Sequence, residues 1–201
     1  MSKIQRALLS CHDKTGIVEL AQLLHDFNVE IISTSGTLSL LREAGIPALS
    51  ISDYTGMPEM MDGRVKSLHP KVHAGLLGLR DSKVHGEQIQ EHQWGWIDLA
   101  VVNLQPVEEA MEHPGVTIDE VVEQIDIGGA AMMRSAAKNF KYVTVAVSPG
   151  RYPRIMHELR AHEGETTYNT RFQLACEAFE CAAAYDAAIG DFLRTHEPSP
   201  M

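Results

Sequence analysis

The sequence predicts an α/β domain in which a central parallel sheet is covered by helices on both faces. Residues 97–104 (IDLAVVNL) and 142–147 (YVTVAV) are apolar without alternation, as expected for strands buried on both faces of such a sheet. Strand-like and helix-like segments also alternate along the chain, which is typical of a doubly wound parallel sheet. Sheets of this kind bind ligands beyond the carboxyl ends of their strands.

The first part of the chain is predicted to alternate short strands with helices. The apolar run 4–9 indicates a buried strand, and apolar residues spaced as in an amphipathic helix occupy 17–24. Residues 29–33 (VEIIS) and 48–51 (ALSI) indicate two further strands, with a helix over 37–45 between them. This order supplies three of the expected strands.

The remainder is predicted to be irregular at first and then helical around the two apolar strands. Glycine and proline interrupt the segment from Ser52 to about His69, and helical patterns lie around 117–125 and 129–139. From about Thr166 an alanine-rich stretch indicates one long helix. We therefore expect one domain over 1–201, with a sheet core over about 1–150 and a helical extension over about 151–201.

Composition narrows the classes of function. Apolar residues make up 44% of the 201-residue chain and charged residues 22%, as in an ordinary globular protein. The net charge is 17 − 27 = −10, which argues against binding to nucleic acid or an anionic membrane. A small anion would need a local cluster of positive charge.

The location expected for the protein is the cytoplasm. The N-terminal apolar run is only about five residues long, too short for a signal peptide or a membrane span. Cys11, Cys176 and Cys181 are odd in number and form no C-x-x-C pair, so a disulfide framework is not expected. We interpret all three as buried packing residues.

Two turns rich in small polar residues follow the first two predicted strands. One contains Ser10, His12 and Lys14, and the other is the run Thr34, Ser35, Gly36 and Thr37. Helix N-termini expose unpaired N–H groups, so such turns can hold a phosphate. Because serine and threonine are also common N-caps, either turn alone fits a simple helix start equally well. Two such turns on successive strands, one of which carries Lys14, strengthen the anion-site interpretation but leave both interpretations open.

A basic cluster lies in the irregular segment. Arg64, Lys66, His69, Lys71 and His73 follow one another within ten residues of an acidic chain. They suit an anion or oxyanion clamp, although a solvated basic surface has the same composition. The i, i+4 spacing of the two histidines also fits a metal pair, but there is no H-E-x-x-H motif, so we predict no metal.

A third group of candidates lies around the strongest strand and the helix after it. Asn103 ends that strand, and Asp126 precedes the Gly128–Gly129 turn of a helix that carries Lys138. Paired glycines let the backbone approach a ligand closely, although they also occur at plain helix starts. The chain has no G-x-G-x-x-G and no P-loop motif, so no nucleotide cofactor is expected.

Several of these segments together resemble the inosine monophosphate cyclohydrolase domain, the N-terminal half of the bifunctional purine-biosynthesis protein PurH. The resemblance rests on SCHDKTGIVELAQLL (10–24), ISTSGTLSLLREAGI (32–46), SDYTGMPEMMDGRVKSLHPKVHAGLL (52–77), VVNLQP (101–106), IDIGGAAMMRSAAKN (125–139) and AYDAAIGDFL (184–193). It implies a three-layer methylglyoxal-synthase-like α/β domain with a central parallel sheet and a helical C-terminal extension. It also implies closure of the ring of 5-formamidoimidazole-4-carboxamide ribotide to inosine monophosphate and water, without a metal or organic cofactor.

The resemblance also implies roles for individual residues. The ribotide phosphate and ribose would be held by Ser10, His12, Lys14, Thr34, Ser35, Gly36, Thr37, Arg64 and Ser67. The reacting base would be surrounded by Lys66, Asn103, Gln105, Asp126, Ile127, Gly128, Gly129 and Lys138. Within this second group, Lys66 and Lys138 would stabilise a developing oxyanion and Asp126 would accept a carboxamide N–H.

Four residues depart from the pattern of that family, of which Ala130 replaces a proline or small apolar residue without an expected consequence. Gln105 stands where the family has a tyrosine, and it donates a hydrogen bond but does not titrate. His12 replaces a usual serine, and Ser35 places a Cβ where the family usually has glycine. These changes leave open a paralogous cyclase that closes a purine-analogue ring, for example a pyrazolopyrimidine nucleotide, and a non-catalytic nucleotide-binding regulatory module.

The resemblance implies partners as well. The family forms homodimers and continues into a transformylase domain, whereas this sequence ends at Met201. We therefore expect a homodimer without a transformylase domain, and a separate formyltransferase that supplies the substrate.

Overall fold

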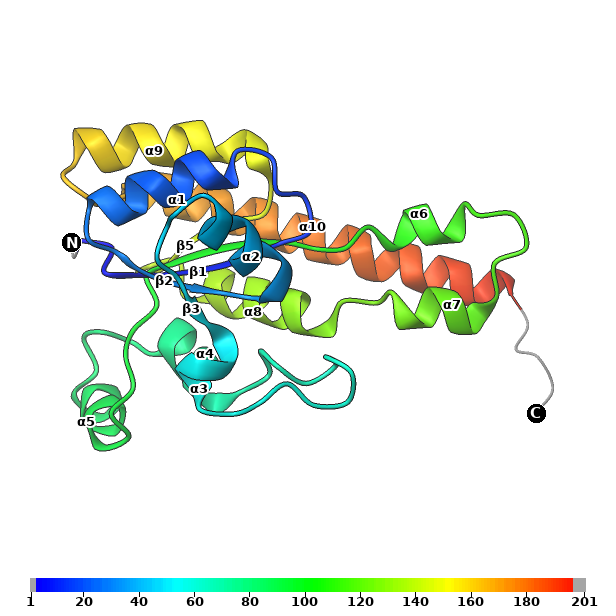
Figure 1. The fold of residues 1–201 in the computed structure, drawn as a ribbon, viewed down its shortest axis with the longest axis horizontal. Coiled ribbons are helices and arrows are strands. Elements are labelled where there is room, and N and C mark those ends of the chain that lie inside the picture. The colour runs from blue at the N-terminus through cyan, green and yellow to red at the C-terminus, as the bar shows by residue number, and fades with distance from the viewer. Residues whose placement is uncertain (1–2, 197–201) are drawn as a thin grey trace.

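The fold is built on one five-stranded sheet in which all neighbouring strands are parallel (Figure 1). The structure is a computed structural model that describes residues 3–196. The strand order is β3-β2-β1-β4-β5, and the strands are β1 Arg6–Cys11, β2 Glu30–Ser33, β3 Leu49–Ser50, β4 Leu99–Asn103 and β5 Thr144–Ala146. Leu8 in the central strand lies opposite Ile32 on one side and Ala100 on the other. The predicted α/β class and parallel sheet are confirmed.

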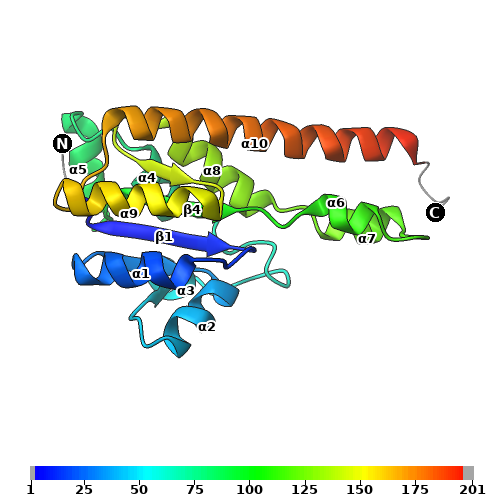
Figure 2. The same cartoon turned by 90° about the horizontal axis from the view of Figure 1, so that it is seen from above.

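Helices form a layer on each side of the sheet. Figure 1 shows α1 and α9 on one side and α4 and α8 on the other, and Figure 2 shows α10 running along β5 and α8. The helices are α1 Ile17–Asp26, α2 Ser35–Glu43, α3 Ile51–Thr55, α4 Pro70–Leu77, α5 Lys83–Glu91, α6 Val107–Met111, α7 Ile118–Glu123, α8 Ile127–Lys138, α9 Tyr152–Ala161 and α10 Tyr168–Thr195, with a 3₁₀ turn at Pro149–Arg151. No helix within residues 3–196 combines the length and apolarity needed to span a membrane.

The main core lies between the sheet and these helices. Leu8, Leu9 and Val101 are fully buried, which explains why their strands lack polar alternation. Leu174 and Ala178 of α10 belong to the same apolar cluster. The first half of the long helix is therefore part of the core.

A second, smaller cluster holds an arm that projects beyond the sheet. Val107 of α6, Val121 of α7, and Tyr185 and Phe192 of α10 form this cluster. Both views show α6 and α7 beside the outer half of α10 (Figure 1, Figure 2). We call residues 105–125 the arm. Its packing on α10 determines where its two ends lie at the edge of the sheet.

Some local predictions were wrong. The segment from Ser52 was expected to be irregular, but it begins within α3, whose N-cap is Ser50, the hydroxyl of which accepts from Asp53 N at 3.0 Å. The helices α5 and α6 were not predicted, because each buries a single residue, whereas α9, which buries three, lies within the predicted helical extension. Cys11 is buried, but Cys176 is exposed and Cys181 is half-buried.

Candidate active site

The carboxyl edge of the sheet opens into a cavity of about 610 Å³, which we call the main cavity. The ends of β1 and β4 reach it, and α8 runs back from this edge, so its N-terminus points there as well. The predicted residues that line it are Ser10, His12, Lys14, Thr34, Gly36, Arg64, Lys66, Ser67, Asn103, Gln105, Asp126, Ile127, Gly128 and Gly129. Predicted site residues that lie far apart in the sequence are thus brought together in one cavity.

One side of the main cavity has the features of an anion site. The Thr34 hydroxyl donates to Ser10 Oγ at 2.9 Å and does not cap α2, whose first N–H groups therefore keep no side-chain partner. The Lys14 side chain lies beside Gly36, where its Nζ would be 3.8 Å from an added Cβ. A helix N-terminus and an ammonium group thus face the same space, which favours a bound phosphate. We call this the phosphate side.

Two predicted phosphate ligands lie outside the cavity lining. The Thr37 hydroxyl is buried, accepts from Cys11 N at 3.0 Å and donates to Cys11 O at 3.2 Å, so it ties α2 to β1. Ser35 is exposed at the first residue of α2, and its hydroxyl faces Glu59 at 3.4 Å. Its φ is not positive, so the Cβ that replaces a family hydrogen causes no backbone strain.

The basic cluster divides between the cavity and the packing of α4. Arg64 reaches across the cavity to form an ion pair with Glu123 of α7. Lys66 lines the cavity and forms neither an ion pair nor a hydrogen bond with any described residue. Its ammonium group is therefore available to a ligand.

The two histidines of this cluster serve the structure around α4. His69 Nδ1 accepts from Lys71 N at 3.1 Å and caps the helix. His73 Nδ1 lies 3.0 Å from Ser135 Oγ of α8, and burial lowers the pKa of its ring. Among the described residues, no cluster of three metal-ligating side chains is found.

The other side of the cavity is formed by the start of α8. Asp126 is its N-cap, and Oδ1 accepts from Gly129 N at 2.7 Å. Oδ2 lies over Gly129, where it would be 2.3 Å from an added Cβ, and the Ser67 hydroxyl would be 2.4 Å from a Cβ at Gly128. Both glycines are therefore required by close packing at the site. We call this the base side.

Asn103 holds the loop that follows β1. Its Oδ1 accepts from Asp13 N at 2.8 Å, and its Nδ2 donates to Asp13 O at 2.9 Å. Asp13 Oδ1 in turn accepts from Thr15 N at 2.9 Å. The amide of Asn103 thus positions the loop that carries His12 and Lys14, in addition to lining the cavity.

Lys138 is not brought to the main cavity. It is the last residue of α8, whereas the cavity is at the first turn, about 17 Å away along the helix axis at 1.5 Å per residue. The side chain is exposed, and a cation in the last turn suits the helix dipole. Within one copy of the chain, the role implied by resemblance does not fit this position.

The structure adds residues that sequence reasoning missed. The hydroxyl of Tyr185, on α10, accepts from Asp126 N at 2.8 Å and so holds the N-cap of α8. Gln124 lines the cavity and forms a hydrogen bond with Gln105. Cys11 also lines it, but burial raises the pKa of its thiol to about 11, so a thiolate nucleophile is not available at neutral pH. Gln124 directly precedes the recognised motif 125–139, but nothing in the sequence pairs it with Gln105.

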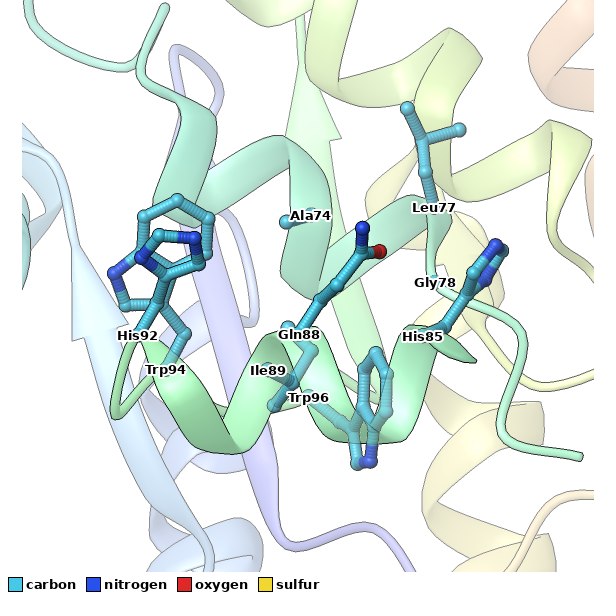
Figure 3. Close-up of a pocket in the computed structure, with 9 residues that line it drawn as sticks. All are labelled: Ala74, Leu77, Gly78, His85, Gln88, Ile89, His92, Trp94 and Trp96. Atoms are coloured by element: carbon cyan, nitrogen blue, oxygen red, sulfur yellow. The ribbon is translucent and has the colours of Figure 1, made fainter. Parts of the chain in front are cut away.

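Two other hollows differ chemically from the main cavity. One, of about 520 Å³, borders it at His12, Gln105 and Gln124 and extends beneath the arm; we call it the arm hollow. The other, of about 300 Å³, is lined by Ala74, Leu77, Gly78, His85, Gln88, Ile89, His92, Trp94 and Trp96 (Figure 3). It contains no lysine or arginine, so it does not suit a phosphate.

The fold and the position of the cavity define the class of protein. Residues 16–131 match the family model described as MGS-like domain, and residues 136–201 match the model described as AICARFT/IMPCHase bienzyme. The chain belongs to the MGS-like domain family and, within it, to the group that contains the inosine monophosphate cyclohydrolase domain of PurH.

Individual relatives support this placement. The bifunctional purine biosynthesis protein PurH of Magnetococcus marinus is 51% identical over 96% of this chain, and that of Streptococcus suis is 54% identical over 94%. The chain spans 36% of the length of either relative. The crystal structure of ForH has a TM-score of 0.83 and 33% identity, with 95% of this chain and 99% of that chain covered.

Proposed function

We propose that the chain is a ring-closing cyclohydrolase that converts 5-formamidoimidazole-4-carboxamide ribotide to inosine monophosphate and water. The observation that carries the proposal is the single cavity in which a phosphate side and a base side face one another. Its size, about 610 Å³, suits a mononucleotide-sized ligand. The similarity to PurH over 96% of the chain supports the same reaction.

The phosphate side accounts for binding and orientation. A ribotide phosphate at the start of α2 would meet free backbone N–H groups, with Lys14 beside it and Arg64 across the cavity. A carboxamide nitrogen is a weak nucleophile, so ring closure depends on holding it against the formyl carbon. Such orientation supplies up to about 7–11 kcal/mol of the barrier in well-aligned reactions.

The base side accounts for the chemical step. As the carboxamide nitrogen bonds to the formyl carbon, the formyl oxygen becomes anionic, and Lys66, which lines the cavity without an ion-pair partner among the described residues, would stabilise it. Asp126, which lines the cavity, would accept an N–H of the attacking group. The former formyl oxygen takes up one proton to become a hydroxyl and a second as it leaves as water, while the formamido nitrogen gives up its N–H proton to form the ring C=N bond. Because Gln105 does not titrate, the second proton would come from Lys66 or from water.

A second candidate function is closure of a purine-analogue ring. Gln105 at the cavity wall, in place of the family tyrosine, favours this candidate because it changes the chemistry offered to the base. A third candidate, a non-catalytic nucleotide-binding module in the cytoplasm, keeps the phosphate side and requires no role for Lys66. A homodimer and a separate formyltransferase remain part of the proposal by resemblance.

The test compares two ribotides with the purified protein. Formation of the bicyclic product is followed by absorbance with the formamidoimidazole ribotide and with its pyrazole analogue. Faster turnover of the imidazole compound supports the main proposal, and faster turnover of the pyrazole compound supports the analogue cyclase. Binding of both without turnover above the spontaneous rate contradicts both enzymes and leaves the binding module.

A further inference from the structure

Two amide side chains meet where the main cavity borders the arm hollow. Gln105 follows β4, and Gln124 is the C-cap of α7, so they come from opposite ends of the arm. Gln105 Nε2 donates to Gln124 Oε1, and both side chains are half-buried. Both line the main cavity and the arm hollow. We call them the amide pair.

The mutual hydrogen bond determines what the amide pair offers a ligand. It engages the amino group of Gln105 and the carbonyl of Gln124, so the Gln105 carbonyl is left as an acceptor and the Gln124 amino group as a donor. If both amides turned over, the two residues would exchange roles, but the pair would still present one acceptor and one donor. Neither group changes charge with pH.

We propose that the amide pair determines specificity by recognising a base edge that carries an N–H donor beside a C=O acceptor. A carboxamide has this edge before ring closure, and the lactam formed from it retains the edge afterwards. The inference rests on the proposed function, because it requires the base to lie on the side of the cavity away from Lys14 and Gly36. On this proposal Gln124 contacts the base of the ligand, a role that its position at the end of α7 does not by itself suggest.

The physical argument is the cost of an unpaired amide. A ligand without the donor and acceptor would displace water from the amide pair without replacing its hydrogen bonds. Sites built to hydrogen-bond a particular group can reject analogues that lack it by several orders of magnitude when fully buried. Because this pair is only half-buried, we expect discrimination of about tenfold to a hundredfold.

The test measures binding of two nucleotides by calorimetry. Inosine 5′-monophosphate has the lactam edge, whereas purine riboside 5′-monophosphate lacks its oxygen and N–H. The unmodified protein should bind the first at least about tenfold more tightly. Gln124→Met removes both polar groups at similar length, and Gln124→Glu retains an acceptor for Gln105 but loses the donor. In both variants the ratio of affinities should fall to within about threefold.

Controls separate this inference from the proposed function. His113→Ala alters only the arm hollow and should leave the ratio unchanged. Ribose 5-phosphate, which does not reach the base side, should bind the Gln124 variants and the unmodified protein within about threefold of each other. Equal binding of the two nucleotides by the unmodified protein, or a ratio that survives in both Gln124 variants, overturns the specificity role alone. If none of the three compounds binds, the ribotide site itself is refuted and the specificity role with it.

Discussion

The two sides of the main cavity are constructed in different ways. Apart from Arg64, the phosphate side comes from consecutive strand ends and helix starts within residues 10–37, where Thr34 contacts Ser10 directly. The base side combines Lys66 with residues from β4, the arm and the start of α8, and the N-cap of α8, Asp126, contacts Tyr185 of α10, 59 residues away. In the proposed function, phosphate binding would therefore depend mainly on local contacts, whereas recognition of the base would depend on long-range packing.

This difference implies that the two sides can be altered separately. Substitutions in the arm or in α10 should alter the ligand contacts on the base side while the phosphate side remains intact. The following predictions test the difference between the two sides. They are given in order from the largest expected effect to the smallest.

Replacement of Lys66 should have the largest effect on turnover. Lys66→Met removes the unpaired cation from the cavity and should lower kcat by about 10²–10³-fold, as the loss of one oxyanion donor typically does. The matched control is Lys138→Met, at the other end of α8, which should change kcat less than about threefold. A large loss in the control would show that Lys138 reaches a reacting ligand, for instance in a second copy.

Gly128→Ala should disturb the contact between α8 and the 60–67 loop. Its Cβ would lie 2.4 Å from Ser67 Oγ, so nucleotide affinity should fall about tenfold or more, in line with about 1–3 kcal/mol for overpacking. In a Ser67→Ala background the same change should cost much less, because the clashing oxygen is gone. Calorimetry on the four proteins of this cycle measures the coupling. Equal losses in both backgrounds would show that the close approach has no consequence.

Tyr185→Phe should loosen the base side with a moderate cost. It leaves Asp126 N without its acceptor, so unfolding should require about 1–2 kcal/mol less free energy. Nucleotide binding should weaken, while ribose 5-phosphate binding stays within about threefold. Tyr168→Phe, at the other end of α10, is the matched control and should be nearly neutral in urea unfolding. If the two variants are alike, the hydroxyl contact does not position α8.

Ser35→Gly should have a small effect on the phosphate side. The family usually has glycine here, but Ser35 is exposed and unstrained in this chain. We expect phosphate affinity to change less than about threefold and stability to fall by no more than about 1 kcal/mol, since glycine is a weaker helix former. A gain of tenfold in phosphate affinity would show that the Ser35 side chain restricts the site.

The smallest expected effect is a difference in the rates at which two cysteine thiols react. The pKa of Cys11 is raised to about 11, so its thiol stays protonated at pH 8 and becomes nucleophilic only as the pH approaches that value. Exposed Cys176 should therefore react with iodoacetamide first, and mass spectrometry would show which residue is modified. Early labelling of Cys11 would mean that the floor of the cavity opens in solution.

The sequence was most informative where a pattern is local. The unbroken apolar runs around Leu8 and Val101 predicted the parallel sheet because full burial removes polar alternation. The turns that contain Ser10 and Thr34 predicted the phosphate side because strand ends in a parallel sheet share an edge. Contacts such as Tyr185 with Asp126 could not be predicted, because the spacing within an alanine-rich helix does not show what its tyrosine reaches.

Thr37 and Lys138, which were both predicted to contact the ribotide, lie outside the lining of the main cavity for the same reason. Both lie within motifs recognised as functional, but a motif does not specify the direction in which each side chain points. The Thr37 hydroxyl turns inward to the backbone of Cys11, and the helical rise carries Lys138 to the far end of α8. The three-dimensional fold therefore selects which residues of a motif can touch a ligand.

The most direct test of the two-sided cavity is a steady-state comparison of Arg64→Met with Lys66→Met. The two residues are neighbours in sequence, and both line the cavity, but we assign Arg64 to phosphate binding and Lys66 to the chemical step. With the formamidoimidazole ribotide, Arg64→Met should raise KM with kcat nearly unchanged, and Lys66→Met should lower kcat with KM nearly unchanged. If both variants change the same parameter, or if the unmodified protein gives no product above the spontaneous rate, the account is contradicted.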